Sequence, residues 1–329
     1  MTNAAFHVTA IGNALVDIIA DAPDSFLTTH QIAKSAMTLI DTERAEKLYT
    51  AIGPAVEMSG GSAANTVAGI ASLGGKAAFM GKVKADQLGE IFRHDLQAQG
   101  VHFATAPSKD STTPTGRCLI LVTPDAERSM NTFLGAAVEF GPTDIDAAVI
   151  RDSQVTYLEG YLFDPPEAKK AFHRAAEIVR ASGRQLALTL SDTFCVERHR
   201  AEFLALTKDH VDILFANQSE LLALYQTQDL NKAIESARAH CKIAITTLSA
   251  KGAIIAASSE TVEVPTVPVA KPVDTTGAGD LFAAGFLFGV THGKTLAEAG
   301  HIGAIAASEV ISHYGPRPQR KLEELIKRT

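Results

Sequence analysis

The sequence has no long apolar run and few cysteines, and these absences exclude several classes of protein. No stretch of its 329 residues approaches the roughly 20 apolar residues that a membrane-spanning helix needs. The opening residues, MTNAAFHVTAIGN, lack the basic region and long apolar run of a secretion signal. Cys118, Cys195 and Cys241 are widely separated and form no CxxC pair. We therefore expect a cytoplasmic protein with reduced thiols.

Clustered basic charge and metal-binding spacings are also missing. The net charge of −7 arises from intermixed acidic and basic residues, without the Lys/Arg stripe that attracts a nucleic-acid backbone. The eleven histidines are scattered and include no HExxH pair, so a zinc site has no support. We expect small-molecule ligands, with neither a nucleic acid nor a membrane as partner.

Two common phosphate-binding motifs are absent as well. The P-loop pattern GxxxxGK[ST] does not occur, and its nearest approach, residues 75–83, has one residue too many and no hydroxyl after Lys82. The most prominent glycine motif, around Gly277, lacks the third glycine of a dinucleotide-binding turn and carries an acid there. Any nucleotide must therefore be bound in another way.

What the sequence does contain is a regular alternation of two patterns. Apolar, β-branched runs of strand length alternate with longer segments of helical period, which predicts an α/β fold with a mainly parallel sheet. We expect strands at 8–12, 155–158, 186–190, 213–216 and 243–247 and helices at 62–73, 166–182 and 219–225. Two stretches, about 17–39 and 113–134, break the rhythm and predict a small β appendage on one large domain.

The sharpest local signal is DTTGAGD at residues 274–280, followed by the apolar run LFAAGFLFGV. A glycine turn that opens a buried helix presents free backbone N–H groups and the positive end of the helix dipole, so Gly277, Ala278 and Gly279 would stabilise phosphoryl oxygens. Asp280 could then accept the proton of an attacking hydroxyl. For a lone GxGD motif, an aspartate that merely caps its helix is the alternative.

Two segments together resemble the ribokinase-like (phosphofructokinase B) family. DTTGAGDLFAAGF resembles its C-terminal signature, and GGSAANTVAGIASLGG at residues 60–75 resembles its N-terminal glycine signature. The resemblance covers nearly the whole chain, and two signatures in the right order are far more specific than one. It implies a single domain, with a central mainly parallel sheet flanked by helices and a β lid from about 17–39 and 113–134, and an ATP-dependent phosphotransferase acting on an alcohol group.

Within that family, the chain is most similar to adenosine kinases, in GNALVDI at residues 12–18 and in the segment 188–220. This resemblance implies transfer of a phosphoryl group from ATP to the 5′-hydroxyl of adenosine, giving AMP and ADP. Asp17, Gly61 and Asn65 would hold the ribose hydroxyls, with Asn13 nearby; a plain turn residue is equally compatible with Asn13. A sugar kinase for ribose, fructose or a sugar acid, and a non-catalytic ligand sensor, are the alternatives.

Further positions are assigned to the nucleotide by resemblance. Asn217 and Glu220, in NQSE, match the NxxE motif that supports Mg²⁺ through water, although a capping arrangement at a helix start fits the same residues. Thr247, Ser249 and Gly252 would lie near the ATP phosphates or ribose. For His301 we expect a place beside the adenine of ATP, and an ordinary helix surface is at least as compatible.

Other expectations concern ions, the purine and basic side chains. Asp274 matches a position that binds a monovalent cation in many relatives, so the resemblance leaves K⁺ open. Leu162, Phe163 and Phe133 are apolar candidates for the purine pocket, and each also suits the core. We expect Arg128 to face solvent from a strand, although in sugar kinases of the resembled family a basic residue near there can contact substrate. The late basic run that begins with Arg317 is expected to form a solvated helix face. The oligomeric state is expected to be a monomer or a homodimer.

Overall fold

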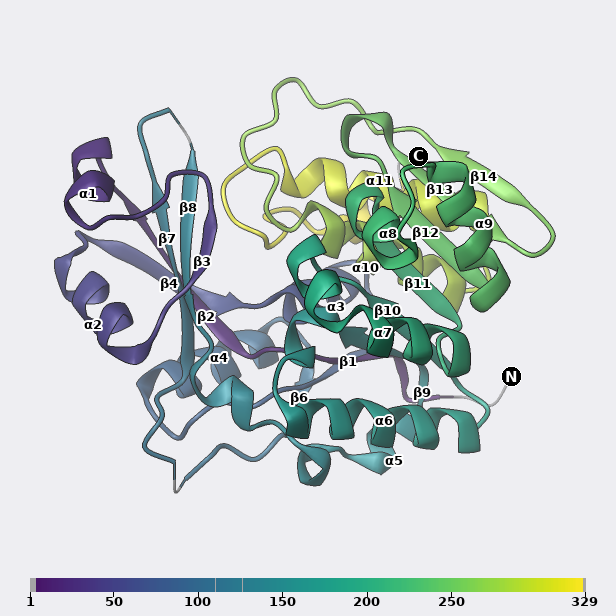
Figure 1. Ribbon diagram of the computed structural model, residues 1–329, viewed down its shortest axis with the longest axis horizontal. Coiled ribbons are helices and arrows are strands. Elements are labelled where there is room, and N and C mark those ends of the chain that lie inside the picture. The colour runs from purple at the N-terminus through teal and green to yellow at the C-terminus, as the bar shows by residue number, and fades with distance from the viewer. Residues whose placement is uncertain (1–3, 110, 126, 328–329) are drawn as a thin grey trace.

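The computed structural model describes residues 4–109, 111–125 and 127–327, and its centre is a nine-stranded sheet (Figure 1). Its strands are β1 (Phe6–Ile11), β5 (Ala77–Met80), β6 (His102–Phe103), β9 (Ser153–Glu159), β10 (Gln185–Thr189), β11 (Ile213–Asn217), β12 (Ile243–Thr247), β13 (Ala253–Ala257) and β14 (Thr261–Val264). The strand order is β14-β13-β12-β11-β10-β9-β1-β5-β6. All neighbours from β12 to β6 pair in parallel, whereas β13 and β14 are antiparallel. The predicted α/β class is therefore confirmed.

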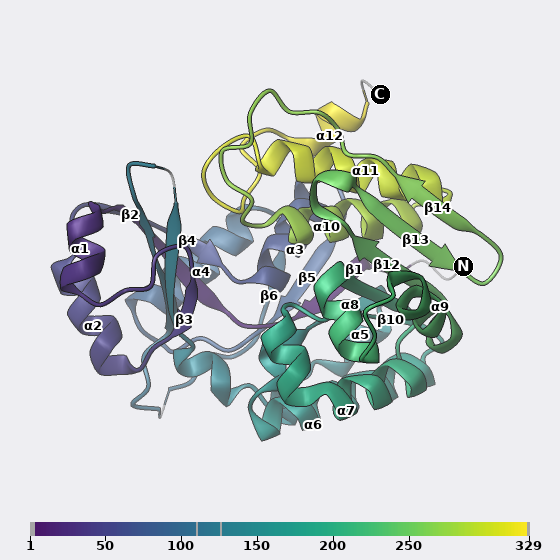
Figure 2. The same cartoon turned by 45° about the horizontal axis from the view of Figure 1, so that its top comes forward.

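Helices cover both faces of this sheet, because its strands are apolar on both sides (Figure 2). One face packs against α3 (Ser62–Ser72), α4 (Gln87–Ala98), α10 (Ala278–Thr291), α11 (Leu296–Val310) and α12 (Leu322–Ile326). The other packs against α5 (Ala147–Arg151), α6 (Pro166–Ala181), α7 (Thr193–Asp209), α8 (Gln218–Tyr225) and α9 (Leu230–His240). Short 3₁₀ turns are η1 (Gly135–Glu139), η2 (Pro142–Asp144), η3 (Gly160–Phe163) and η4 (Ser249–Lys251).

Helices α3 and α10 approach one another unusually closely, and this brings their N-termini together. A Cβ atom at Gly69 of α3 would lie 2.6 Å from a side-chain carbon of Leu281 and 2.7 Å from the Cβ of Ala284, both in α10. Only glycine leaves room for this contact, since real Cβ atoms do not approach other carbons so closely. The close packing fixes the start of α3 beside the start of α10.

A second sheet of five strands stands at one end of the molecule (Figure 1, left). Its strands are β2 (Leu15–Asp21), β3 (Met37–Leu39), β4 (Ala55–Gly60), β7 (Gly116–Val122) and β8 (Arg128–Phe133), in the order β3-β8-β7-β2-β4. Helices α1 (Asp24–Thr29) and α2 (Thr42–Ala51) accompany it. Four of these strands lie wholly or largely within the two stretches that break the α/β rhythm. The edge strand β4 lies outside both, because its sequence AVEMSG carries only a short, weakly apolar strand signal.

Within the described ranges, no helix combines the length and the apolar character needed to cross a bilayer. The buried helix α10 is the most apolar, and it has 14 residues. Its burial is explained by packing between α3 and α11 within one core.

Candidate active site

Several predicted site residues follow the carboxyl ends of parallel strands, at one edge of the central sheet. Asn13 lies just beyond β1, Asn217 ends β11 and Thr247 ends β12. Asn217 and Thr247 are register partners on neighbouring strands. The carboxyl edge is where open α/β sheets bind their ligands, because loops and helix N-termini gather there. The structure therefore brings the predicted acceptor and nucleotide residues to one edge.

The turn before α10 leaves backbone N–H groups free at the start of the helix. Gly277 precedes the helix with φ of 79°, a left-handed conformation that favours glycine, and a Cβ there would lie 2.8 Å from the Cβ of Pro316. At Gly279 a Cβ would meet nothing within 4 Å, so this side of the turn is open. Among the described residues, the N–H groups of Gly279 and Asp280 have no hydrogen-bond partner. Two free donors at a helix N-terminus can bind phosphoryl oxygens.

Asp280 does not cap its own helix. Its Oδ1 accepts a hydrogen bond from the Ser62 hydroxyl (2.6 Å), and its Oδ2 accepts one from Asn65 Nδ2 (2.9 Å). Both donors belong to the first turn of α3, and no side chain caps α10. The structure thus contradicts the alternative that Asp280 is an ordinary helix cap. Burial raises the pKa of its carboxyl group, while Ser62, Asn65 and Arg317 favour the ionised form.

Asp17, from strand β2, lies buried beside this cluster. Its carboxyl group packs so closely on Gly60 that any Cβ there would come within 2.4 Å of it. Burial and the nearby Asp280 raise the pKa of Asp17 to about 7, although Arg317 and Arg128 oppose this rise. No hydrogen bond to the Asp17 carboxyl group is present among the described residues, so its oxygens are free to accept hydrogen bonds from a ligand.

The remaining predicted acceptor residues converge on the same place. Gly61 has φ of 94°, and a Cβ there would lie 2.3 Å from the carbonyl oxygen of Asn13, so the start of α3 rests on the turn after β1. Asn65 is buried, and its Oδ1 has no partner in the described part of the chain. A free acceptor on Asn65 beside the carboxyl groups of Asp17 and Asp280 suits a ligand with several hydroxyls.

Glu159, the last residue of β9, was missed by the sequence analysis. It is 1% exposed and accepts hydrogen bonds from Asn13 N (3.2 Å), Asn13 Nδ2 (2.8 Å) and Ala63 N (2.7 Å). A Cβ at Gly12 would lie 2.4 Å from its Oε2, so only glycine fits there. Burial raises the pKa of Glu159 to about 7 against these three donors. This carboxyl group ties β1, β9 and α3 together, which accounts for the fixed position of Asn13.

Two basic residues were predicted wrongly. Arg128 does not face solvent: its side chain is 7% exposed, and its Nη1 lies 2.8 Å from Asp274 Oδ2. This ion pair connects the second sheet to the main body. Arg317 does not lie on a solvated helix face. It follows α11 in an irregular segment and donates hydrogen bonds to Ser59 and Ala64 near the start of α3. Charge alone could not reveal either position, because both depend on contacts far along the chain.

Both carboxylate oxygens of Asp274 accept a backbone hydrogen bond. Its Oδ1 accepts from Thr276 N (3.0 Å), and its Oδ2 accepts from Gly315 N (3.0 Å) and faces Arg128. The guanidinium beside Oδ2 disfavours a cation at that oxygen, whereas Oδ1 has a single protein donor. A K⁺ site at Asp274 therefore stays a prediction.

Asn217 and Glu220 form a reciprocal capping box at the start of α8. Asn217 Oδ1 accepts from Glu220 N, and Glu220 Oε2 accepts from Asn217 N, both at 2.9 Å. The capping alternative is thus present in the structure, yet it leaves Glu220 as a buried acid near Asp192 whose pKa burial raises to about 7. No positive side chain compensates the charge of Glu220 among the described residues. No group of three metal-ligating side chains occurs in the described ranges.

The other nucleotide candidates are spread along the same flank. Gly252 follows η4 with φ of 90°, and a Cβ there would lie 2.0 Å from the carbonyl oxygen of Val264. Ser249 is exposed and has φ of 55°. His301 is exposed on α11. The turn after β12 is therefore strained and open to solvent, while His301 stays compatible with either a ligand contact or an ordinary surface position.

Comparison with known proteins decides the family. The model of the pfkB family carbohydrate kinases matches residues 30–322, nearly the whole chain. The chain belongs to the pfkB family. This confirms the predicted family, the ribokinase-like fold and the class of phosphotransferases that act on hydroxyl groups.

Similar pfkB-family proteins are known under more than one description. The crystal structure of adenosine kinase from Sinorhizobium meliloti is 55% identical, with a TM-score of 0.92 and 99% of each chain covered. A probable sugar kinase from Rhizobium etli is 54% identical, with a TM-score of 0.92 over 99% of this chain and 98% of that one. Adenosine kinase from Saccharomyces cerevisiae is 26% identical over 95% of this chain and 97% of its own length.

The three apolar candidates for a purine pocket lie in different parts of this pfkB-family protein. Leu162 and Phe163 are buried in the core. Phe133 is also buried, and it lines a mostly apolar cavity of about 190 Å³ with Leu39, Leu134 and Val138. This cavity lies where the ends of β3 and β8 adjoin η1.

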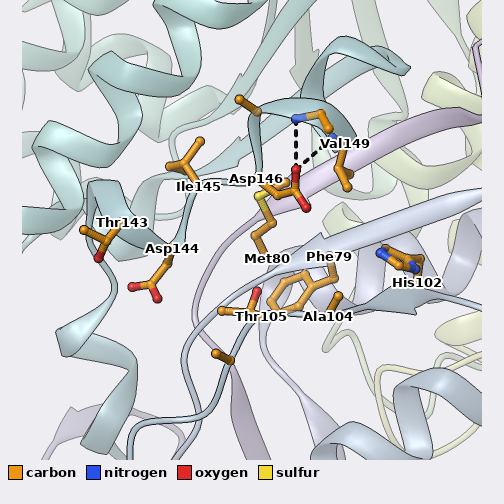
Figure 3. A pocket seen from close by; sticks show the side chains of 13 residues that line it. Phe79, Met80, His102, Ala104, Thr105, Thr143, Asp144, Ile145, Asp146 and Val149 are labelled. Carbon is orange, nitrogen blue, oxygen red and sulfur yellow. Dashed lines mark hydrogen bonds between the residues drawn. The ribbon is translucent and has the colours of Figure 1, made fainter.

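A larger cavity, of about 470 Å³, lies elsewhere in this pfkB protein, between β5, β6 and α5 (Figure 3). Asp146 stands at its wall, but its carboxylate caps α5 by accepting from the backbone N–H groups of Ala148 and Val149. None of the predicted site residues lines this cavity. Cavity size alone would therefore point away from the chemistry.

Proposed function

We propose that the protein is an adenosine kinase, which transfers the γ-phosphoryl group of ATP to the 5′-hydroxyl of adenosine and releases AMP and ADP. The observation that carries this proposal is the placement of Asp280. Its carboxylate is held by Ser62 and Asn65 from α3, beside the buried Asp17 and next to the free N–H groups of the α10 turn. A proton acceptor, hydroxyl-binding groups and an anion-binding turn thus adjoin one another.

On the acceptor side, the chain's own residues suffice to position a ribose. Asp17 and the unpartnered Oδ1 of Asn65 accept hydrogen bonds from the 2′- and 3′-hydroxyls, with Gly61 and Asn13 shaping the floor. The 5′-hydroxyl then faces Asp280. As its oxygen attacks phosphorus, its proton passes to the Asp280 carboxylate, while Gly277, Ala278 and Gly279 stabilise the charge on the transferred group.

On the donor side, the phosphates of ATP lie toward Thr247, Ser249 and Gly252, with His301 toward the adenine. ATP is implied by membership of a kinase family. Mg²⁺ would be held near Glu220 and Asn217 through water, where it would neutralise charge on the phosphates. Asp192 adds a second nearby carboxylate. K⁺ is left out of this proposal, because the Arg128 guanidinium lies beside Oδ2 of Asp274.

The second sheet acts in this proposal as a lid on a single kinase domain. Arg128 joins its strand β8 to the main body, and the apolar cavity beside Phe133 supplies a place for the purine. Such a cavity favours a nucleoside over a free sugar, since a sugar has no apolar face of that size to bury. A cytoplasmic location and a monomeric or homodimeric state remain predictions.

A sugar kinase is the second candidate, since the same hydroxyl-binding groups and the same Asp280 would serve a free sugar. The similarity to the probable sugar kinase of Rhizobium etli supports this second candidate. ADP release should be measured over a panel of nucleosides, ribose, fructose and sugar acids. Adenosine should give the highest kcat/KM. A higher value for any sugar would overturn the nucleoside assignment, and no turnover of any acceptor would favour a ligand sensor.

Replacing Glu220 by glutamine should weaken the response to Mg²⁺. Glutamine preserves the capping box but removes the charge. We therefore expect the apparent affinity for Mg²⁺ to fall roughly 10- to 100-fold and turnover to decrease, with adenosine affinity nearly unchanged. Initial rates over a Mg²⁺ titration measure this. Glu298→Gln is the matched control, because Glu298 completes the equivalent capping box with Thr295 at the start of α11. A Glu220→Gln titration like that of the control would remove Glu220 from the site.

A further inference from the structure

Arg317 joins two elements on either side of the Gly60–Gly61 pair. Its Nε and Nη2 donate to the carbonyl oxygen of Ser59 at 3.2 and 2.9 Å, and Nη2 also donates to the Ser59 hydroxyl at 3.0 Å. Its Nη1 donates to the carbonyl oxygen of Ala64 at 2.8 Å. Ser59 is near the end of β4 in the second sheet, whereas Ala64 is in the first turn of α3. One guanidinium therefore spans the joint between the lid strand and the main body.

The joint that Arg317 spans determines where the acceptor groups lie. Gly60 packs on the Asp17 carboxyl group, and Gly61 rests on the backbone of Asn13. A pair of glycines is conformationally free, so the joint needs contacts from elsewhere to hold one geometry. Asp95 of α4 supplies one by accepting from Ser59 N at 2.8 Å. Arg317 supplies the other, and it alone connects Ser59 directly to α3 among the described hydrogen bonds.

Arg317 also places positive charge among buried carboxyl groups. It favours the ionised forms of Asp17, Asp280 and Asp95, while burial lowers its own pKa only to about 10, so it stays charged at neutral pH. Asp280 is otherwise faced by polar or ionisable groups from α3, β2, β9 and η3, namely Ser62, Asn65, Asp17, Tyr157, Glu159 and Tyr161. The guanidinium is thus the positive charge that acts directly on Asp280.

We propose that Arg317 is a positioning residue for the phosphoryl acceptor, which fixes the Ser59–Ala64 joint and supplies the cation behind Asp17 and Asp280. This inference rests on the proposed kinase function. The Arg317 side chain then has two distinct effects. The hydrogen-bonded fork sets the geometry of the acceptor site, and the charge favours the ionised forms of both carboxyl groups.

Two substitutions distinguish these effects. Arg317→Gln removes both fork and charge, so kcat/KM for adenosine should fall roughly 10- to 100-fold through a higher adenosine KM, with the KM for ATP nearly unchanged. The acid limb of its pH profile should move to higher pH, because Asp280 protonates more readily without the cation. Arg317→Lys keeps the charge but not the fork. It should restore the acid limb while the adenosine KM stays raised.

Arg320→Gln is the matched control, because Arg320 lies on the same segment with an exposed side chain. If Arg317→Gln does not fold, the Arg317→Lys variant provides the test. The proposal is overturned if the KM values of this variant for adenosine and ATP both equal those of the wild type. It is also overturned if both KM values rise together. An unmoved acid limb in a folded Arg317→Gln variant also overturns it. Should the wild type prefer a sugar, the nucleoside proposal fails, yet the same variants tested on that sugar still examine the role of Arg317.

Discussion

Replacing Asp280 by asparagine should lower kcat roughly 10²- to 10⁴-fold while adenosine still binds. The amide matches the carboxylate in size but cannot take up the proton of the 5′-hydroxyl. Folding should survive the change, because the amide fills the same volume and Ser62 can still donate to its oxygen. Single-turnover rates, adenosine affinity and thermal unfolding of the variant measure the three parts of this expectation.

An ordinary helix-capping aspartate provides the control for Asp280. Asp229 caps α9 by accepting from the backbone N–H groups of Asn231 and Lys232. Asp229→Asn should alter stability by about 1 kcal/mol or less and leave kcat unchanged. If Asp280→Asn behaves like this control, with native stability and near-normal kcat, then Asp280 is not the proton acceptor.

Removing a ribose hydroxyl should have the second large effect. Because Asp17 is a buried acceptor without a protein donor, 2′-deoxyadenosine or 3′-deoxyadenosine should lose roughly 10- to 150-fold in kcat/KM, the range expected for a hydrogen bond to a charged group. The Asp17→Asn variant should discriminate much less between adenosine and these analogues. Specificity ratios measured on both enzymes form a cycle that isolates the contact.

The pH dependence of adenosine binding gives an independent view of Asp17. Its pKa is raised to about 7, so the ionised acceptor form is favoured above that pH and lost as the pH falls through it. The KM for adenosine should therefore decrease as the pH rises from about 6 to 8. Asp21→Asn, at the exposed end of the same strand, serves as the control.

Full discrimination against both deoxynucleosides by Asp17→Asn would exclude Asp17 from the ribose site.

Much of the central sheet was predictable because its strands are buried on both faces. The strand at 243–247 has the predicted bounds, the one predicted at 213–216 is one residue longer, and the one predicted at 186–190 is shifted by one residue at both ends. Periodicity identifies such runs well, since a short, continuous apolar run between helical segments is typical of a buried parallel strand. The edge strand β4 was not predicted because it is short, only weakly apolar and exposed at its start.

The candidate site was predictable only where a residue belongs to a local motif. Asp280, Gly277 and Asn65 lie in glycine signatures, and Asp17 and Glu220 lie in short segments that resemble family motifs. Glu159 and Arg317 have no local pattern of this kind. Their importance comes from contacts with residues 96 or more positions away, such as Glu159 with Ala63 and Arg317 with Ala64. No composition or spacing rule anticipates such pairings, because the fold alone creates them.

The most direct test of adenosine phosphorylation is a one-pot reaction followed by ³¹P NMR. Adenosine, ribose and fructose are supplied at equal concentration with limiting ATP and Mg²⁺, and the phosphomonoesters formed are identified by their shifts. Because Asp280 faces the 5′-hydroxyl of a nucleoside bound by Asp17 and Asn65, AMP should be the dominant new ester, formed in equal amount with ADP. A dominant sugar phosphate, or phosphate on the 2′- or 3′-hydroxyl of adenosine, would contradict that assignment.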